Sequence, residues 1–264
     1  MSADRGDIGR TLGRPGVEDE NGRERVEVWR ISLGDEDDPE HCPASLEGLL
    51  EDLLDEDEKA RAERGLVPGM RRRFVIAHAA TRIVVGARLG RPPAALRFAR
   101  GRWGKPVVEG AGLHFSLSHS GDIALLALAS RPVGVDVELA RPNLDTERLA
   151  RRFFGDEERE SVARDGIGAF TRLWTRKEAC VKAVGGRLTE GMAIPVAHTA
   201  RQATVYSRSG PFAGPWRVAD LLLPEGYAGS VALLGDGPFY VSPRMWYPMS
   251  PTETEGMRQR PGVK

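Results

Sequence analysis

The sequence predicts an α+β fold built from two similar halves, each a small antiparallel sheet packed with helices. Three observations support this prediction. Apolar and polar residues alternate through Val26–Leu33, as they do in a strand. Helical segments and then short strands follow this segment. The same order of strand, helices and strands recurs from Gly134 onward. No sharp sequence repeat accompanies this order, so the two halves are inferred from the order of elements.

The first half, over residues 25–131, begins with a strand that has one buried face, because apolar and polar residues alternate through Val26–Leu33. Leucines at three-and-four spacing between residues 46 and 54 predict a helix, and Phe74–Leu89 predicts a longer one. Short strands are expected next, at Leu96–Ala99, His114–Ser118 and Ile123–Ala129.

The second half, over residues 132–236, repeats this order. A strand carries Gly134–Glu138, and helices are expected over about Leu144–Phe153, from about Asp156, and around Lys177. Strand-like runs follow, at Ala203–Ser207, Trp216–Leu223 and Tyr227–Leu234.

Composition excludes several classes of protein. Lys plus Arg and Asp plus Glu both number 38, so no basic excess points to nucleic acid or to a membrane surface. The longest apolar run, Ile123–Ala129, is too short to span a bilayer, and the two cysteines lack disulfide or metal-ligand spacing. A cytoplasmic protein is expected, with a disordered tail at residues 1–24 and a partly disordered one at residues 237–264.

Two short acidic segments predict a magnesium and phosphate site. Asp136 and Glu138 alternate with valines on a strand, so both carboxylates point to one face. Glu178 and Lys182 are four residues apart on a helix and therefore share one side. Magnesium takes oxygen ligands, and a nearby lysine balances phosphate charge, so the four side chains together favour phosphoryl-group chemistry.

Each acidic segment alone has an ordinary explanation as a solvated sheet face or as helix surface pairing worth about 0.3–0.5 kcal/mol. Gly134 ahead of the strand acids favours a site, and so does Lys177, which a helical wheel places in the apolar arc of its helix. A lysine there is costly unless it meets an anion or a carboxylate.

Ser118 and His119 are adjacent on a strand and point to opposite faces, which excludes a serine-hydrolase dyad. A turn rich in small polar residues can still expose amide groups and the histidine to a phosphate. His78 lies on an apolar helix and is expected to be a packed residue rather than a ligand. In the basic run 71–73, Arg73 is the residue expected to face a cleft.

Six motifs carry a family resemblance: Arg72–His78, Gly104–Pro106, Phe115–Asp122, Gly134–Glu138, Arg152–Phe154 and Trp174–Lys182. In order and spacing they resemble the 4′-phosphopantetheinyl transferases of the monomeric Sfp type, over about Val26–Leu234. The resemblance implies two pseudo-symmetric α+β halves with the active site between them, in a monomer.

By this resemblance the protein moves the phosphopantetheine arm of coenzyme A onto a serine of an apo acyl or peptidyl carrier protein, with magnesium, and releases adenosine 3′,5′-bisphosphate. Asp136, Glu138 and Glu178 fall on the magnesium-binding acids, and Glu178 is also the candidate general base. Lys182 falls on a lysine that contacts coenzyme A phosphate and serves catalysis. The other expected coenzyme A contacts are Arg61, Arg73, Arg100, Lys105, Ser118 and His119.

Cys180 departs from the family pattern, which has an aromatic residue there, and is expected to change packing more than chemistry. Two alternatives use the same residues: a magnesium-dependent phosphodiesterase with water as nucleophile, and a non-catalytic scaffold that binds coenzyme A or a carrier. Neutral net charge disfavours a nuclease, and the intact acids disfavour the scaffold. The motifs do not specify a carrier of fatty acid, polyketide or nonribosomal peptide synthesis.

Overall fold

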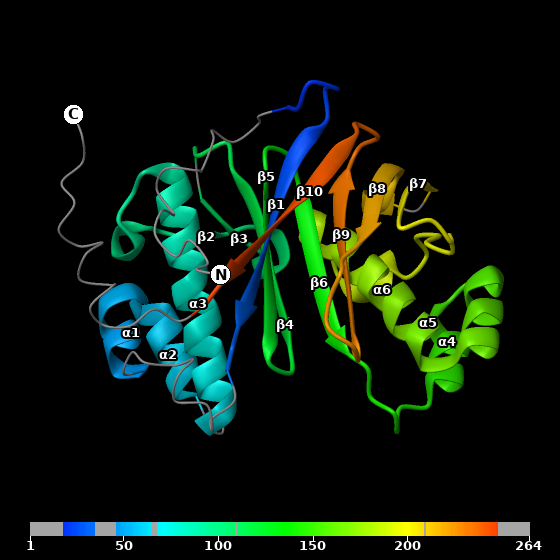
Figure 1. Ribbon diagram of the computed structural model, residues 1–264, viewed down its shortest axis with the longest axis horizontal. Helices are drawn as coiled ribbons and strands as arrows, with labels where there is room; N and C mark the ends of the chain where they lie inside the picture. Colours follow the sequence, from blue (N-terminus) through cyan, green and yellow to red (C-terminus); the bar gives the residue numbers. More distant parts are fainter. Residues whose placement is uncertain (1–17, 35–45, 65–67, 109, 209, 248–264) are drawn as a thin grey trace, which may run out of the picture.

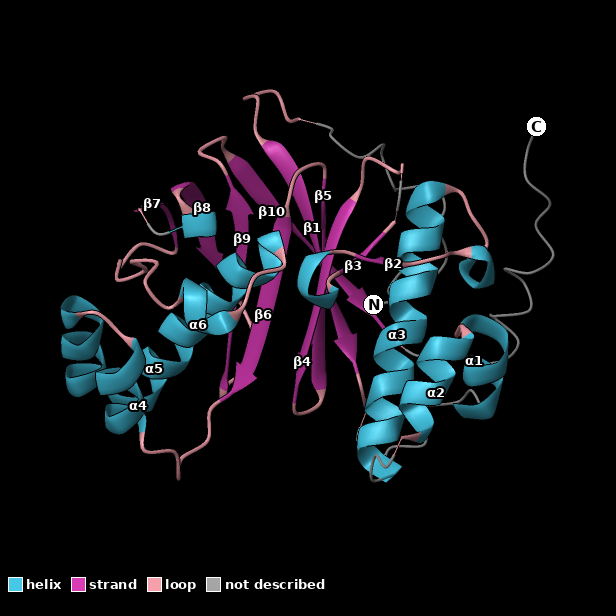
Figure 2. Cartoon of the chain, turned by 180° about the vertical axis from the view of Figure 1, so that it is seen from behind, coloured by secondary structure: helices cyan, strands magenta, loops and turns pink. Residues whose placement is uncertain are grey.

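The computed structural model describes residues 18–34, 46–64, 68–108, 110–208 and 210–247. Two four-stranded sheets lie side by side in the middle of the molecule, and the helices cover their outer flanks (Figures 1 and 2). The first half contains β1 (Glu24–Ser32), α1 (Leu46–Leu53), α2 (Glu56–Glu63), α3 (Pro68–Leu89), β2 (Ala99–Arg100), β3 (Pro106–Val107), β4 (His114–Ser120) and β5 (Ile123–Ala129). The second contains β6 (Val133–Leu139), α4 (Thr146–Phe153), α5 (Asp156–Val184), α6 (Leu188–Gly191), β7 (Gln202–Ser207), β8 (Gly214–Asp220) and β9 (Tyr227–Leu234), and β10 (Phe239–Trp246) ends the described chain.

The fold is α+β as predicted, and the two halves share a three-stranded arrangement, β1-β5-β4 in the first and β6-β9-β8 in the second. The first sheet has the order β10-β1-β5-β4 and the second the order β6-β9-β8-β7. In each half the opening strand is followed by helices and then pairs antiparallel with the last strand of that half, β1 with β5 and β6 with β9. A small separate sheet joins β2 to β3.

The expected strand at Leu96–Ala99 is wrong for most of its length, because only Ala99–Arg100 pairs as β2. A short 3₁₀ turn at Pro93–Ala95 precedes it. The guanidinium of Arg82 on α3 donates to the carbonyl oxygens of Pro93 at 3.2 Å and Leu96 at 3.1 Å. The buried Arg82 side chain therefore supplies the hydrogen bonds that a neighbouring strand would have given to these backbone carbonyl groups.

The two helices expected from Asp156 and around Lys177 are both present and follow each other directly within α5. Gly166 within it has φ 62° and ψ −145°, a non-helical conformation open to glycine, so two helical segments meet there at a kink. The helix ends at Gly185, whose φ of 66° and ψ of 40° are left-handed and common after a helix C-terminus.

Strand β10 lies in the segment that the sequence assigned to a C-terminal tail. It runs parallel to β1, from the pair Glu24 and Phe239 to the pair Ile31 and Trp246. Phe239 and Trp246 are buried at its two ends, while Pro243 is exposed, as suits an edge strand. The chain thus returns to the first half after completing the second.

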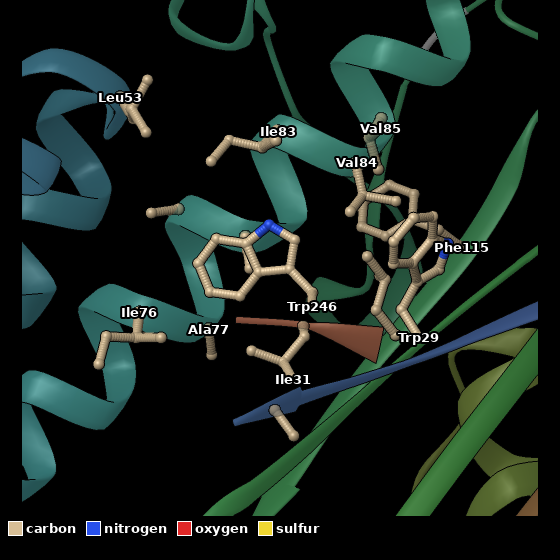
Figure 3. Packing of buried hydrophobic residues seen from close by; sticks show 14 of the residues in the cluster. Trp29, Ile31, Leu53, Ile76, Ala77, Ile83, Val84, Val85, Phe115 and Trp246 are labelled. Carbon is tan, nitrogen blue, oxygen red and sulfur yellow. The ribbon is translucent and has the colours of Figure 1, made fainter. Parts of the chain in front are cut away.

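The core has three parts. One packs α3 against the first sheet, where Trp246 lies beside Ile31 and faces α3 (Figure 3). A second lies between α5 and the second sheet. The third joins the halves, because valines of β6 pack with residues of β1 and β5. Every residue of β5 is buried, as expected for a strand covered on both faces.

No helix in the described part of the chain combines the length and the apolarity needed to span a bilayer.

Candidate active site

The two sheets meet along their edge strands β4 and β6, where serine hydroxyls join them. Ser116, Ser118 and Ser120 occupy every second position of β4 and are buried, so they point the same way. Ser118 Oγ donates to Asp136 Oδ1 at 2.7 Å, and Ser120 Oγ donates to Glu138 Oε2 at 3.0 Å. The two strand acids therefore lie at the junction between the halves.

Gly134 lets α5 lie directly on β6. A Cβ atom at this position would stand 1.9 Å from the carbonyl oxygen of Ala179 and 2.4 Å from the backbone nitrogen of Ala183. Both atoms belong to the backbone of α5, so no side chain other than hydrogen fits. This contact sets Glu178 and Lys182 against the strand that carries Asp136.

A charged hydrogen-bond network links α5 to both edge strands. Lys182 Nζ donates to Asp136 Oδ1 at 2.6 Å and to Ser118 Oγ at 2.8 Å. Asp136 is almost fully buried, with 1% of its surface exposed, whereas the Lys182 side chain keeps 32%. The lysine therefore binds a buried carboxylate while part of its side chain remains exposed.

The three acids influence one another's protonation. Burial raises the pKa of Asp136, and burial together with the charge of Asp136 raises the pKa of Glu138. Burial raises the pKa of Glu178 to about 7, with Asp136 and Glu138 adding to the effect and Lys182 opposing it. Carboxylates that raise one another's pKa are typical of a site that receives a cation.

The chemistry of these residues fits a hard cation. Asp136 Oδ2 is buried without a hydrogen-bond partner, and a carboxylate oxygen in that state is costly unless a cation or a donor reaches it. In the described part of the chain, however, no three His, Cys, Asp or Glu side chains are close enough together to hold a metal ion as they stand. Binding one would require the acids to draw closer together.

A cleft of about 390 Å³ opens beside the network. Its walls come from α2, α3, the turn between β2 and β3, β4 and the end of α5, so both halves contribute. Five of the predicted coenzyme A contacts line it, namely Arg61, Arg100, Lys105, His119 and Lys182.

His119 faces this cleft from β4. Its ring is exposed, yet partial desolvation by the cleft walls, followed by the charges of His78, Lys182 and Arg73, lowers its pKa. Cations that repel one another around an open space are arranged to receive an anion. The cleft is therefore suited to phosphate groups.

A family model for the 4′-phosphopantetheinyl transferase superfamily matches residues 132–232, which hold all three acids and Lys182. Over 243 residues the chain is 32% identical to the 4′-phosphopantetheinyl transferase HetI of Nostoc sp., covering 85% of this chain and 92% of that relative. The chain belongs to the 4′-phosphopantetheinyl transferase superfamily. Shorter matches include AcpT of Salmonella typhimurium, 45% identical over 92 residues (33% of this chain, 48% of the relative). Sfp of Bacillus subtilis is 33% identical over 106 residues (38% of this chain, 45% of the relative).

As an Sfp-like phosphopantetheinyl transferase, the chain is an enzyme that modifies carrier proteins. Lys105, in the Gly-Lys-Pro turn, lines its cleft but uses its ammonium elsewhere. Nζ donates to the carbonyl oxygens of Val133 at 2.9 Å and Ala183 at 2.7 Å, and burial lowers the pKa of the side chain to about 8. Lys105 of this transferase thus ties the first half to the start of β6 and the end of α5.

Two other predicted contacts of the transferase also have protein partners. Arg73 donates to Asp122 Oδ1 at 2.6 Å and is not among the residues that line the cleft. Ser118 is held between Asp136 and Lys182. A role for either residue at coenzyme A stays a prediction.

Lys177 is buried and meets a carboxylate as expected, but its partners are structural, so it does not mark the site as its position in the sequence suggested. Its side chain is 1% exposed and lies 2.8 Å from Glu158 Oε1, and it donates to the carbonyl oxygens of Met192 and Ile194 at 2.7 Å each. The lysine fixes α5 to the chain that follows it. Cys180 is fully buried in the second core, and burial raises its pKa to about 12, so its thiol serves packing.

His78 is more than the packed residue that its sequence surroundings predict. The ring stacks on Phe74, with centroids 4.0 Å apart, as expected for a packed residue. The same residue also lines the cleft, and its Nδ1 lies 2.8 Å from Glu58 Oε1. Spacing could not reveal this, because Glu58 lies on a different helix, α2.

Proposed function

We propose that this transferase uses magnesium held by Asp136, Glu138 and Glu178, and that it releases adenosine 3′,5′-bisphosphate as it modifies a carrier serine. The observation that carries the proposal is the bond from Lys182 to Asp136 beside the unpartnered Oδ2, at the edge of a cleft lined by cations. When bound, the cation would neutralise charge on the pyrophosphate of coenzyme A and polarise it.

Lys182 is placed to contact both the strand acid Asp136 and a phosphate in the cleft. Its ammonium is fixed by Asp136 and Ser118, and its partial exposure leaves it within reach of a phosphate in the cleft. Arg61, Arg100 and His119 line the same space and would hold the nucleotide phosphates. Positioning and charge stabilisation of this kind supply most of the catalysis of phosphoryl transfer.

The reaction needs an acceptor for one proton. The oxygen of the carrier serine forms a bond to the β-phosphorus of coenzyme A, and the bond from that phosphorus to the bridging oxygen breaks, so that oxygen leaves with adenosine 3′,5′-bisphosphate. Glu178 is our candidate for the proton of the serine hydroxyl, because it lies one turn from Lys182 on the same helix and its pKa in the metal-free protein is about 7, near neutral pH.

The partners are an apo acyl or peptidyl carrier protein and coenzyme A. We also propose that the enzyme acts as a cytoplasmic monomer, without nucleic acid or membrane. The shared topology of the two halves and the core that joins them support a monomer, since both walls of the cleft come from one chain.

One assay tests the proposal. The protein is incubated with coenzyme A, magnesium and an apo carrier, and mass spectrometry looks for the phosphopantetheine increment on the carrier. Glu178→Gln is expected to lose turnover while keeping much of its coenzyme A binding, and Glu147→Gln, an exposed acid of α4, is the matched control. Unchanged labelling by Glu178→Gln would refute its role. Cleavage of coenzyme A without labelling would indicate a hydrolase, and binding alone a scaffold.

A further inference from the structure

We propose that His78 is a further specificity-determining residue, which contacts the 3′-phosphate of coenzyme A, and that Glu58 positions it. The inference rests on the proposed function and names a phosphate contact that the sequence motifs did not supply. His78 is fixed in the cleft wall by its neighbours on α2 and α3.

The ring of His78 is held in one orientation. Its face stacks on Phe74 with an interplanar angle of 25°, and its Nδ1 is 2.8 Å from Glu58 Oε1. No hydrogen bond to its Nε2 occurs among the described residues, and this atom is not among the buried atoms that lack a partner. Since the residue lines the cleft and is 20% exposed, Nε2 is the ring atom available to a bound molecule.

Glu58 fixes the protonation pattern of that ring. Burial alone would raise the pKa of Glu58, but the hydrogen bond and charge of His78 and the charge of Arg82 outweigh it and lower the pKa. Arg82 Nε donates to Glu58 Oε2 at 2.6 Å, so the carboxylate is itself anchored. An ionised carboxylate at Nδ1 requires a proton on that nitrogen, which fixes the ring with Nε2 as the atom left for a bound molecule.

The surroundings of His78 point to an anion with several oxygens. Arg61 lies over the same Phe74 ring on which His78 stacks, with its guanidinium carbon 4.9 Å from the ring centroid, and it lines the cleft. His119 lines the same cleft, and the charge of His78 contributes to lowering its pKa. One arginine and two histidines from α2, α3 and β4 thus converge as donors on one space.

The remaining charged groups around this space are accounted for. Glu58 and Asp55 both bind Arg82, which leaves Asp57 as an exposed acid of the lining. The basic side chains of the lining are Arg61, Arg100, Lys105 and Lys182, with the two histidines as further nitrogen donors. A terminal phosphate monoester carries close to two negative charges near neutral pH and three acceptor oxygens, which matches three donors better than a carboxylate does.

The test compares coenzyme A with 3′-dephospho-coenzyme A as substrates of the full-length enzyme. For His78→Phe, which can keep the stack on Phe74, KM for coenzyme A is expected to rise about tenfold or more with little change in kcat. With 3′-dephospho-coenzyme A the variant and the wild type are expected to have equal kcat/KM. His78→Gln, which can keep a donor toward Glu58, is a second variant in case the first does not fold.

His114→Phe is the matched control, because His114 lies on β4 outside the residues that line the cleft, and both substrates should be used as by the wild type. An equal loss on both substrates would overturn the proposal in favour of a structural role, and so would no loss on either. Failure of the wild type to label a carrier with either substrate would instead refute the proposed function itself.

Discussion

Replacing Gly134 by alanine is expected to move α5 away from β6 and to remove most of the transfer activity. The new Cβ would lie 1.9 Å from Ala179 O, where ordinary contact needs about 3.4 Å. The strand and the helix must therefore separate by roughly 1.5 Å, because the clashing atoms are backbone and cannot rotate away. Strain of this kind costs about 1–3 kcal/mol, or several degrees in Tm for a chain of this size.

The separation reaches the site directly. Lys182 lies one residue before Ala183, the second backbone contact of Gly134, and its bond to Asp136 is 2.6 Å long. Adding roughly 1.5 Å takes that bond beyond hydrogen-bond reach. Misplacing a catalytic group by about 1 Å can cost roughly 100-fold in rate, so a similar fall in kcat is expected.

The assay is the initial rate of carrier labelling, together with thermal unfolding of the same preparation. Gly168→Ala is the matched control, since this glycine lies in α5 with no atom within 4 Å of an added Cβ. That variant should keep the wild-type rate and gain up to about 1 kcal/mol of stability. If Gly134→Ala labels a carrier at the wild-type rate, the close contact does not position the site.

Three further predictions concern buried groups. The pKa of Glu178 is raised from 4.5 to about 7 in the folded state. The folding stability that comes from protonating this side chain is therefore fully present below pH 4.5 and is lost as pH rises through about 7. Without magnesium, Glu178→Gln should therefore have a higher Tm than the wild type at high pH and lose this advantage in acid; a difference independent of pH would contradict the assignment. Lys177→Met should destabilise the fold by about 3–5 kcal/mol because it leaves Glu158 buried without its cation, and adding Glu158→Gln should recover part of the loss in denaturant titrations. In a Cys42→Ser variant, Cys180 should react with a thiol reagent only on unfolding, and fast reaction of the native protein would show that the thiol is accessible.

Local patterns predicted the parts of the site that depend on a single element. Asp136 and Glu138 share a face of β6 because a strand repeats every two residues, and Glu178 and Lys182 share a side of α5 because they are four apart. The apolar arc around Lys177 likewise indicated a buried partner, which the structure supplies in Glu158. In each of these cases the information lies within a few residues of chain.

Other features depended on segments that are distant in the sequence. Strand β10 pairs with β1 more than 200 residues earlier, and Pro243 in its middle is unusual for a strand, although Phe239 and Val241 favour one. Lys105 appeared free to meet phosphate, yet it donates to carbonyl groups of the second half. His78 enters the cleft wall because α2 packs beside α3 and brings Glu58 to its ring.

By itself, the sequence determined the class of fold, the order of its elements, the acids and lysine that share each face, and the family to which these motifs are similar. The tertiary structure decided which of those side chains meet. Periodicity and local propensity act over a turn of helix or a few residues of strand, whereas the bond between Lys182 and Asp136 exists because a helix packs on a strand at a glycine with room for nothing larger.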